Sequence, residues 1–397
     1  MFSMQFYFVT LCLKYGIMLV VMIKKITLLL SLFSTTLALA IPAAVEECFK
    51  NLSSKKTEIF TPRYATGFRY YKKEDFIILE SQGKFFLLSS HHKPPPCLNI
   101  PNFNIPIKTL VTFSTTHLPF IQQLKKENLV LGFAGMEFVN NPIILEQFKK
   151  GKTKDVAYPP REEMLLSLKP DAIFTYAVQQ KDESELEHQK KLGLPMVPMS
   201  EYKEDHPLAR AEWLIFMGLF FDQENVAKEI FSNQVDEYER LRLQLKKISF
   251  RPRVIIGELQ NGVWYAPRGG SDLARLIEDA GADYVWKDKM GKGFMTISFE
   301  EVLKLMSSHS GELFWLPQNS WTKGNEIIKA DPRYKTLGLF KNVKIFNHNL
   351  IYNKKGYSDY WETGIANPHL LLKDLISIFH PKVLSTHQRK WYHELKL

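Results

Sequence analysis

The longest regular pattern of apolar and polar positions in the 397-residue chain runs from Asp222 to Ile248. Apolar residues recur there at three-, four- and seven-residue steps, with mostly charged positions between them: Val226, Ile230, Tyr238, Leu241 and Leu245. This spacing predicts one amphipathic helix. Asp222 at the cap position favours its start, and Pro252 prevents its continuation. About 25 residues at about 1.5 Å each would span about 37 Å, which is enough to cross between two lobes.

The segments on both sides of this helix alternate between strand-like and helix-like patterns. Before it, we expect strands at 109–113, 129–133, 172–176 and 196–198 and helices at 117–126, 161–168, 183–192 and 207–221. After it, we expect strands at 254–258, 313–316 and 344–346 and helices at 271–280, 299–306, 368–379 and 386–395. Such alternation predicts mostly parallel sheets covered by helices. The fold class is therefore α/β, with one Rossmann-like lobe at 107–221, another at 251–397, and the helix at 222–250 bridging them.

The first forty residues have the zones of an export signal. Lys24 and Lys25 precede an apolar run at 26–39 that ends in small residues, so we expect cleavage after Ala40. Residues 6–21 are also largely apolar, and the two runs together would be long enough for a membrane anchor, although Met22 is the better start. No cysteine stands directly after the small residues at the expected cleavage point, so we do not expect a lipid anchor.

Residues 41–106 show a third pattern, which predicts a β-rich extension. Short strand-like runs between 57 and 90 are separated by Gly67 and Gly83 and end before a run of prolines. This extension contains Cys48 and Cys97. Two cysteines in an exported chain most simply form one disulfide, whereas metal binding by a lone pair is the less favoured alternative.

Composition excludes some classes of function. Hydrophobic residues make up 45% of the chain and charged residues 24%, as in a globular protein. Residues 1–40 hold three lysines and no acid, so the rest keeps +7 of the formal net charge of +10. Its lysines and arginines are interleaved with acids, which argues against nucleic-acid binding. The chain also lacks the G-x-S-x-G, G-x-x-x-x-G-K and H-E-x-x-H patterns of common enzyme classes.

Aromatic residues and a glycine-rich turn give the clearest chemical signals. Trp264, Trp321 and Trp361 are expected in loops that follow strands, at the sheet edge where α/β proteins bind ligands. Trp286 and Trp315 are instead expected in the core. The turn Arg268–Ser271 opens a predicted helix, and its amides are candidates for holding an anionic group.

Several segments in combination resemble the substrate-binding proteins of ABC importers for iron siderophores, haem and vitamin B12. The matching segments are L-K-P-D-A-I at 168–173, L-G-L-P-M-V at 192–197, E-N-V-A at 224–227, W-Y-A-P-R-G-G-S at 264–271, A-G-A at 280–282, I-S-F-E-E-V-L at 297–303 and D-Y-W-E at 359–362. The resemblance covers about residues 107–382. The chain departs from it at Ala282, where a second glycine is common, and at 307–312, where Pro-Asp is usual. The extension, with Y-A-T-G-F at 64–68, is similar to a variant subgroup.

The resemblance implies a periplasmic, monomeric, non-enzymatic protein without a cofactor or resident metal. Such a protein would capture an iron chelate, haem or cobalamin between its lobes and meet the membrane only through an ABC importer permease. By position, the implied ligand contacts are Ser114, Thr115, Thr116, His117, Trp264, Tyr265, Arg268 and Trp361. The implied permease-docking residues, one for each lobe, are Glu163 and Glu300. A continuous bridging helix would allow only a small closure.

Two other functions remain open from the sequence. A receptor for bare manganese or zinc ions would need three or four converging ligands, of which His117 is a candidate. An enzyme on the same architecture, such as a chelatase or a lyase, would need a titratable pair in the cleft. The candidates for that pair are His117, Asp359 and Glu362.

Overall fold

A computed structural model describes residues 43–52, 55–90, 95–176, 180–307, 312–337 and 343–396. Among these residues, no helix combines the length and the apolar character needed to cross a membrane. The predicted signal at 1–40 and the start at Met22 lie outside the described residues. The chain divides into two compact units, and the smaller one joins the N-terminal part up to Lys56 with Pro95–Asn99.

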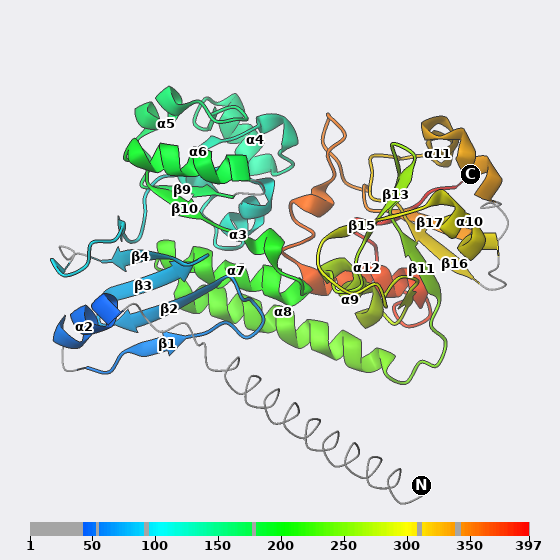
Figure 1. The fold of residues 1–397 in the computed structure, drawn as a ribbon, viewed down its shortest axis with the longest axis horizontal. Helices are drawn as coiled ribbons and strands as arrows, with labels where there is room; N and C mark the ends of the chain where they lie inside the picture. The colour runs from blue at the N-terminus through cyan, green and yellow to red at the C-terminus, as the bar shows by residue number, and fades with distance from the viewer. Residues whose placement is uncertain are drawn as a thin grey trace, which may run out of the picture. The chain divides into compact units, whose positions relative to one another are not determined.

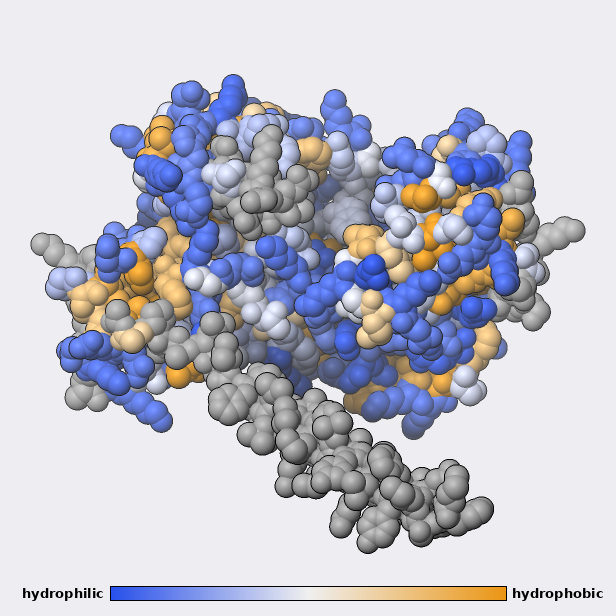
Figure 2. All heavy atoms as spheres, in the orientation of Figure 1, coloured by the Kyte–Doolittle hydropathy of each residue, from blue (hydrophilic) through white to orange (hydrophobic). Residues whose placement is uncertain are grey.

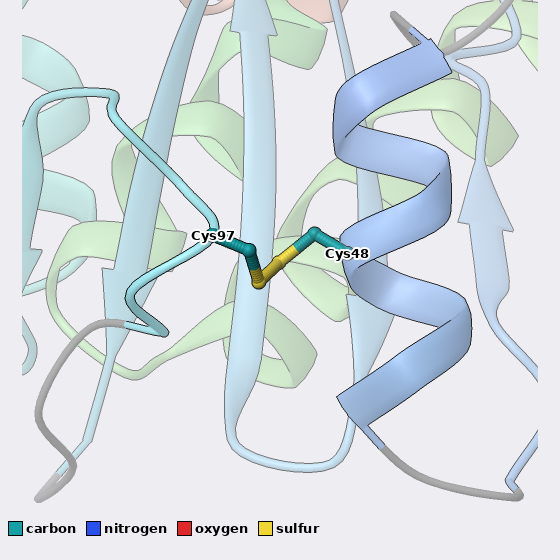
Figure 3. Close-up of a disulfide and its surroundings, with 2 residues drawn as sticks. All are labelled: Cys48 and Cys97. Carbon is teal, nitrogen blue, oxygen red and sulfur yellow. A yellow bond between two sulfur atoms is a disulfide. The ribbon is translucent and has the colours of Figure 1, made fainter.

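The smaller unit consists of a helix and a short loop joined by a disulfide. Helix α2 (Ala43–Leu52) carries Cys48, which is bonded to Cys97 with the two Cα atoms 5.7 Å apart (Figure 3). The predicted pairing is therefore confirmed. The sequence pattern did not single out this helix, in which Val45 and Cys48 lie three residues apart on one buried face.

The larger unit begins with a five-stranded sheet. Its strands are β1 (Glu58–Phe60), β2 (Phe68–Lys73), β3 (Phe76–Ser81), β4 (Lys84–Ser89) and β5 (Asn102–Asn104), in that spatial order. Neighbours are antiparallel except β4 and β5. Phe68 packs against Trp213 and Phe216 of a helix described below, with ring centroids 5.0 and 5.6 Å away. This sheet is thus part of the main hydrophobic core of the larger unit.

The first α/β lobe has a fully parallel sheet in the order β10-β9-β6-β7-β8. Its strands are β6 (Leu110–Thr112), β7 (Val130–Phe133), β8 (Lys154–Asp155), β9 (Ala172–Thr175) and β10 (Met196–Pro198). Its helices are α3 (Leu118–Gln123), α4 (Pro142–Lys149), α5 (Glu162–Leu168) and α6 (Gln180–Lys191). The sequence pattern missed α4, although Asn141 and Pro142 mark its start: the Asn141 side chain accepts from the amides of Ile143 and Ile144.

The second lobe also has a five-stranded sheet, in the order β14-β11-β16-β17-β18, which is parallel except for β18. Its strands are β11 (Arg253–Ile256), β14 (Asp283–Tyr284), β16 (Leu313–Leu316), β17 (Val343–Asn347) and β18 (His393–Glu394). A second, antiparallel sheet contains β12 (Glu258–Gln260), β13 (Val263–Pro267) and β15 (Phe294–Ile297). The helices are α9 (Asp272–Asp279), α10 (Phe299–Ser307), α11 (Gly324–Ala330) and α12 (Pro368–Phe379).

The predicted helix at 386–395 is wrong, because this segment is extended. The buried carboxylate of Asp374 accepts hydrogen bonds from the backbone amides of Lys390 and Trp391. Backbone donors that are bound to a side chain are not available for a helical turn. The chain then pairs with β17 as strand β18.

Two packed helices connect the lobes. Helix α7 (Pro207–Phe220) is almost entirely buried, and α8 (Glu224–Leu245) is the predicted bridging helix (Figure 1). The 22 residues of α8 span about 33 Å. The predicted cap is wrong: Asp222 has a left-handed φ of 54°, and Gln223 is the N-cap. The buried stripe of α8 is Ala227, Phe231, Gln234, Val235, Tyr238, Leu241 and Leu245, whereas Val226 is exposed.

The two lobes bridged by α8 confirm the predicted fold class. The surface also matches the interleaved charges of the sequence, because hydrophilic residues are spread over the visible face among smaller apolar patches (Figure 2).

Candidate functional site

The predicted ligand-binding turn of the first lobe lies at the carboxyl end of β6. Residues 115–117 form a 3-10 helix, η1, that Ser114 caps by accepting a hydrogen bond from the amide of Thr116 at 3.3 Å. Ser114, Thr115 and Thr116 are half-buried. His117 is fully buried, and its Nδ1 lies 2.7 Å from the hydroxyl of Thr112. The three hydroxyl residues are therefore better placed than His117 to meet a ligand.

Behind this turn lies Glu201, which the sequence pattern did not single out. It is buried on η4 (Glu201–Lys203), which follows β10. The hydroxyl of Thr116 donates to its carboxylate, and His117 Nε2 lies 3.6 Å from its Oε2. Burial opposes ionisation, but the neighbouring His117 and the Thr116 hydroxyl outweigh it and hold the pKa of Glu201 below its usual range.

The two lobes meet at a polar cluster in which Glu201 and Tyr360 are buried and Arg210 and Asp272 are half-buried. We call these four residues the interlobe floor. Arg210 projects from α7 and donates to Asp272 of α9 at 2.8 Å. Burial disfavours the guanidinium charge, but the carboxylate of Asp272 outweighs it, so the pKa of Arg210 is raised. Glu201 and Tyr360 act on the same charge. Arg210 therefore links the first-lobe turn electrostatically to the second lobe.

The floor is tightly packed. A cavity of about 20 Å³ adjoins Arg210, Asp272 and Tyr360 and has room for about one water molecule. A larger cavity, of about 290 Å³, lies elsewhere, between the β2–β3 hairpin and the start of α8, and is lined by Lys72, Gln223 and Glu224. None of the residues predicted to bind ligand lines that larger cavity.

The glycine-rich turn Arg268–Ser271 does not offer the free amides that the sequence suggested. The amide of Gly269 donates to the carbonyl of Lys289 at 3.0 Å, and that of Gly270 donates to Gly291 at 3.2 Å. A Cβ atom on Gly269 would lie 1.9 Å from the carbonyl oxygen of Lys287, so the glycine serves close backbone packing. This prediction is wrong because the chain itself uses the amides.

Trp264 and Tyr265 lie on β13 and point to opposite faces of its sheet. Trp264 is fully buried, and its indole donates to the carbonyl of Ile256 at 2.9 Å. The expected loop position is therefore wrong, and the ring is not exposed to a ligand. Tyr265 is 37% exposed on the other face. Arg268 is half-buried, and its Nη1 lies 3.5 Å from the carbonyl of Met290.

The remaining tryptophans follow the sequence expectations more closely. Trp286 and Trp315 are buried in the core, as predicted. Trp321 does follow β16 in a loop, but its ring packs on Trp315 and Tyr334 at 5.9 and 5.6 Å. Trp361 is 40% exposed. Of the three predicted loop tryptophans, Trp361 is thus the one best placed for a ligand.

Trp361 is presented by a short turn, η6 (Asp359–Trp361), that is held from behind. Ser358 caps the turn, and Asp359 Oδ2 accepts from the indole of Trp391 at 3.0 Å. Burial raises the pKa of Asp359. The ring of Tyr360 packs edge-on against Trp361 at 4.9 Å. These contacts fix the ring of Trp361 beside the interlobe floor.

The three candidates for an enzymatic acid–base pair have separate partners. His117 lies against Thr112, Asp359 against Trp391, and Glu362 accepts a hydrogen bond from the amide of Asn140. Within the described part of the chain, no group of three or more His, Cys, Asp or Glu side chains is arranged to hold a metal ion.

The two glutamates predicted to dock on a permease occupy equivalent places in the two lobes. Glu163 lies in the first turn of α5 and Glu300 in the first turn of α10, and both are exposed. Helix α5 leads into β9, which pairs with β6, whereas α10 leads into β16, which pairs with β11. Each glutamate thus lies at the start of a helix that leads into a strand paired with the first parallel strand of its lobe.

The chain is similar to known proteins in its sequence. Residues 146–347 match the family model described as periplasmic binding protein. An uncharacterized lipoprotein of Methanocaldococcus jannaschii is 24% identical, over 77% of this chain and 75% of the relative. A second uncharacterized protein of that organism is 19% identical, over 71% of this chain and 84% of its own length.

Solved structures share the fold at low identity. A possible iron-binding, periplasmic solute-binding protein from Staphylococcus epidermidis aligns with a TM-score of 0.52 and 16% identity, over 69% of this chain and 99% of that protein. A periplasmic heme-binding protein from Pseudomonas aeruginosa aligns with a TM-score of 0.52 and 14% identity, over 73% of this chain and 99% of that one. At these identities, both structures show a shared two-lobe fold and nothing further.

Proposed function

Because this chain belongs to the periplasmic binding protein family, we propose that it captures a bulky iron chelate, haem or cobalamin between its lobes and delivers it to an ABC importer permease. One observation carries the proposal: the hydroxyl-rich turn of the first lobe and the Trp361 turn of the second meet through Arg210. On this proposal the protein is exported to the periplasm, acts as a monomer and meets the membrane only through the permease.

The exposed groups suit a large ligand with a planar or apolar part. Trp361 and Tyr265 offer aromatic surface for stacking, and Arg268 offers a positive charge. Ser114, Thr115 and Thr116 offer hydroxyl groups that both donate and accept hydrogen bonds. The iron- and heme-binding names of the two solved structures support the same class of ligand.

A ligand panel tests this function directly. The protein is titrated with ferric siderophores, haem and cobalamin while its tryptophan fluorescence and melting temperature are recorded. A ligand at 100 times its Kd should add about 2.7 kcal/mol to the free energy of unfolding. Absence of any response, together with tight binding of manganese or zinc, would contradict the proposal and favour a metal-ion receptor.

Replacing Trp361 tests the position of the site. The Trp361→Ala variant should bind the ligand about tenfold more weakly, because an aromatic stacking contact contributes about 0.5–1.5 kcal/mol. Its stability should change little, since the ring is 40% exposed. The matched control is Trp264→Ala, which should lose about 3–5 kcal/mol of stability because that ring is fully buried. Equal destabilisation of both variants would identify Trp361 as a core residue.

Charge reversal tests the docking residues. Glu163→Lys and Glu300→Lys should leave ligand binding unchanged but abolish uptake through the permease. Unimpaired uptake would reduce both acids to their ordinary role at helix N-termini, where a carboxylate favours the helix dipole.

A further inference from the structure

The two lobes also touch through a pair of loops, and the proposed function makes no use of this contact. The second-lobe segment 350–362 meets the first-lobe segment 137–141, and we call this contact the rim latch. Asn353 Nδ2 donates to the carbonyls of Glu137 and Val139 at 2.8 and 3.2 Å. Asn140 Nδ2 donates to the carbonyl of Tyr357 at 3.2 Å. The rings of Phe138 and Tyr357 pack edge-to-face at 4.6 Å.

The second-lobe half of the latch is a preformed hairpin. Asn353 Oδ1 accepts from the amides of Lys355 and Tyr357 at 2.9 and 3.1 Å, and Tyr352 and Ser358 form a β-bridge. In Figure 1 it is the orange hairpin that rises between the two lobes. A hairpin that is ordered by its own bonds can engage and leave the first lobe as one piece.

Glu362 completes the latch with a buried acid. Its Oε2 accepts from the backbone amide of Asn140 at 2.6 Å, next to the N-terminus of α4. Among the described residues, its Oε1 has no hydrogen-bond partner, although the side chain is almost fully buried. Burial raises the pKa of Glu362 to about 8, against the opposing effect of the Asn140 amide. A second-lobe acid is thus inserted into the first lobe with one oxygen unsatisfied.

Hydrogen bonds from Asn140 and Asn141 favour the ionised form of Glu362, but they do not outweigh the effect of burial on its pKa. Asp359, on the same segment, adds a repulsive negative charge and is itself held by Trp391 and Thr363. The first-lobe residues in contact are Asn140 and Asn141, which are uncharged. Among the described residues, no cation is one of the strongest influences on the pKa of Glu362. Ionisation of Glu362 would therefore place an unpaired charge in a buried contact.

We propose that the hairpin and Glu362 form a proton-sensitive latch between the lobes, closed while Glu362 is protonated and released when it ionises. Because Trp361 directly precedes Glu362, release also moves the ring that we assign to the ligand. The latch then controls access to the cleft and ligand release, and this last step rests on the proposed function.

The direction of the pH dependence follows from the two states of Glu362. An open lobe returns the carboxyl to water, where its pKa is about 4.3. The closed state, with a pKa of about 8, therefore binds the proton more tightly. The proton-linked stability of the closed state is complete below about pH 4.3 and is lost progressively as the pH rises to about 8.

The test measures the separation of the lobes without any ligand. Spin labels are attached to Lys149→Cys at the end of α4 and Lys329→Cys on α11, both exposed positions. The third cysteine of the full chain, Cys12, is replaced by serine so that it takes no label. The distance distribution should lengthen between pH 6 and pH 9. The Glu362→Gln variant, a neutral isostere, should keep the short distance at both pH values. Glu278→Gln, at an exposed acid on α9, is the matched control and should behave like the unsubstituted protein.

The possible outcomes distinguish the latch from the proposed function. Identical distributions at pH 6 and pH 9 in the unsubstituted protein would overturn the latch, and so would a Glu362→Gln variant that still opens. Asn353→Ala should lengthen the distance already at pH 6, which supplies a second check if Glu362→Gln fails to fold. A protein that latches but answers no ligand in the panel would refute the proposed function alone, and ligand binding without pH-dependent opening would refute the latch alone.

Discussion

The interlobe floor and the rim latch join the same two lobes with opposite chemistry. At the floor, Arg210 and Asp272 form an ion pair between a guanidinium that stays charged at all ordinary pH values and a carboxylate 2.8 Å away. At the latch, Glu362 faces an uncharged amide and depends on being neutral. The difference indicates that the floor, together with α8, is a permanent connection, whereas the latch is conditional. On this proposal, the rim latch determines whether the two lobes are closed.

Removing Asp272 should have the largest effect. The Asp272→Ala variant leaves Arg210, whose side chain is only 11% exposed, without its carboxylate. Loss of one partner of a buried pair typically costs about 3–5 kcal/mol, and we expect the lower end because Asp272 is 28% exposed. Denaturant unfolding at pH 7 measures this loss. Asp331→Ala is the control: it breaks a pair whose arginine, Arg333, is 43% exposed, and it should cost less than about 1 kcal/mol.

A loss in Asp272→Ala no greater than in the Asp331→Ala control would remove the distinction between the two connections. The floor would then be a contact that solvent screens, like an ordinary surface pair.

The Glu362→Gln variant should have a smaller effect that depends on pH. A closed-state pKa of about 8 makes the folded protein lose stability between pH 6 and pH 8, because folding then requires a proton that the unfolded chain does not hold. At about 1.4 kcal/mol for each pH unit, Glu362 should remove about 2–3 kcal/mol over this range. Unfolding curves at pH 6 and pH 9 should show this loss in the unsubstituted protein and not in the variant. Equal losses in both proteins would assign the pH dependence to other groups.

The sequence predicted the architecture well because periodic patterns are local. The bounds of the strand at 313–316 and the helix at 368–379 coincide with β16 and α12, where apolar runs are bounded by clear breaks. The bridging helix was recognised from the same kind of pattern. Its start was misplaced, because the left-handed turn at Asp222 depends on how α7 and α8 pack.

The site was predicted less well because its contacts join distant parts of the chain. Trp264 and Tyr265 are adjacent in sequence, but the alternation of β13 buries the first ring and exposes the second. Glu201 and Arg210 lie outside any motif, and they matter because folding brings them to Thr116 and Asp272. Glu362 stood in a recognised segment, yet its bond to Asn140 spans 222 residues and leaves no local signal.

A third contact between the lobes should have the smallest effect and so isolates the role of burial. Lys292 and Asp205 form an ion pair of 2.8 Å, as short as the pair at the floor, but their side chains are 66% and 42% exposed. Water screens such a pair, so Lys292→Ala should change the free energy of unfolding by less than about 0.5 kcal/mol. The label distance at pH 6 should also stay unchanged. A loss comparable to that of Asp272→Ala would contradict this role of burial. Ion pairs between the lobes would then stabilise the protein to a similar extent whether their side chains are buried or exposed.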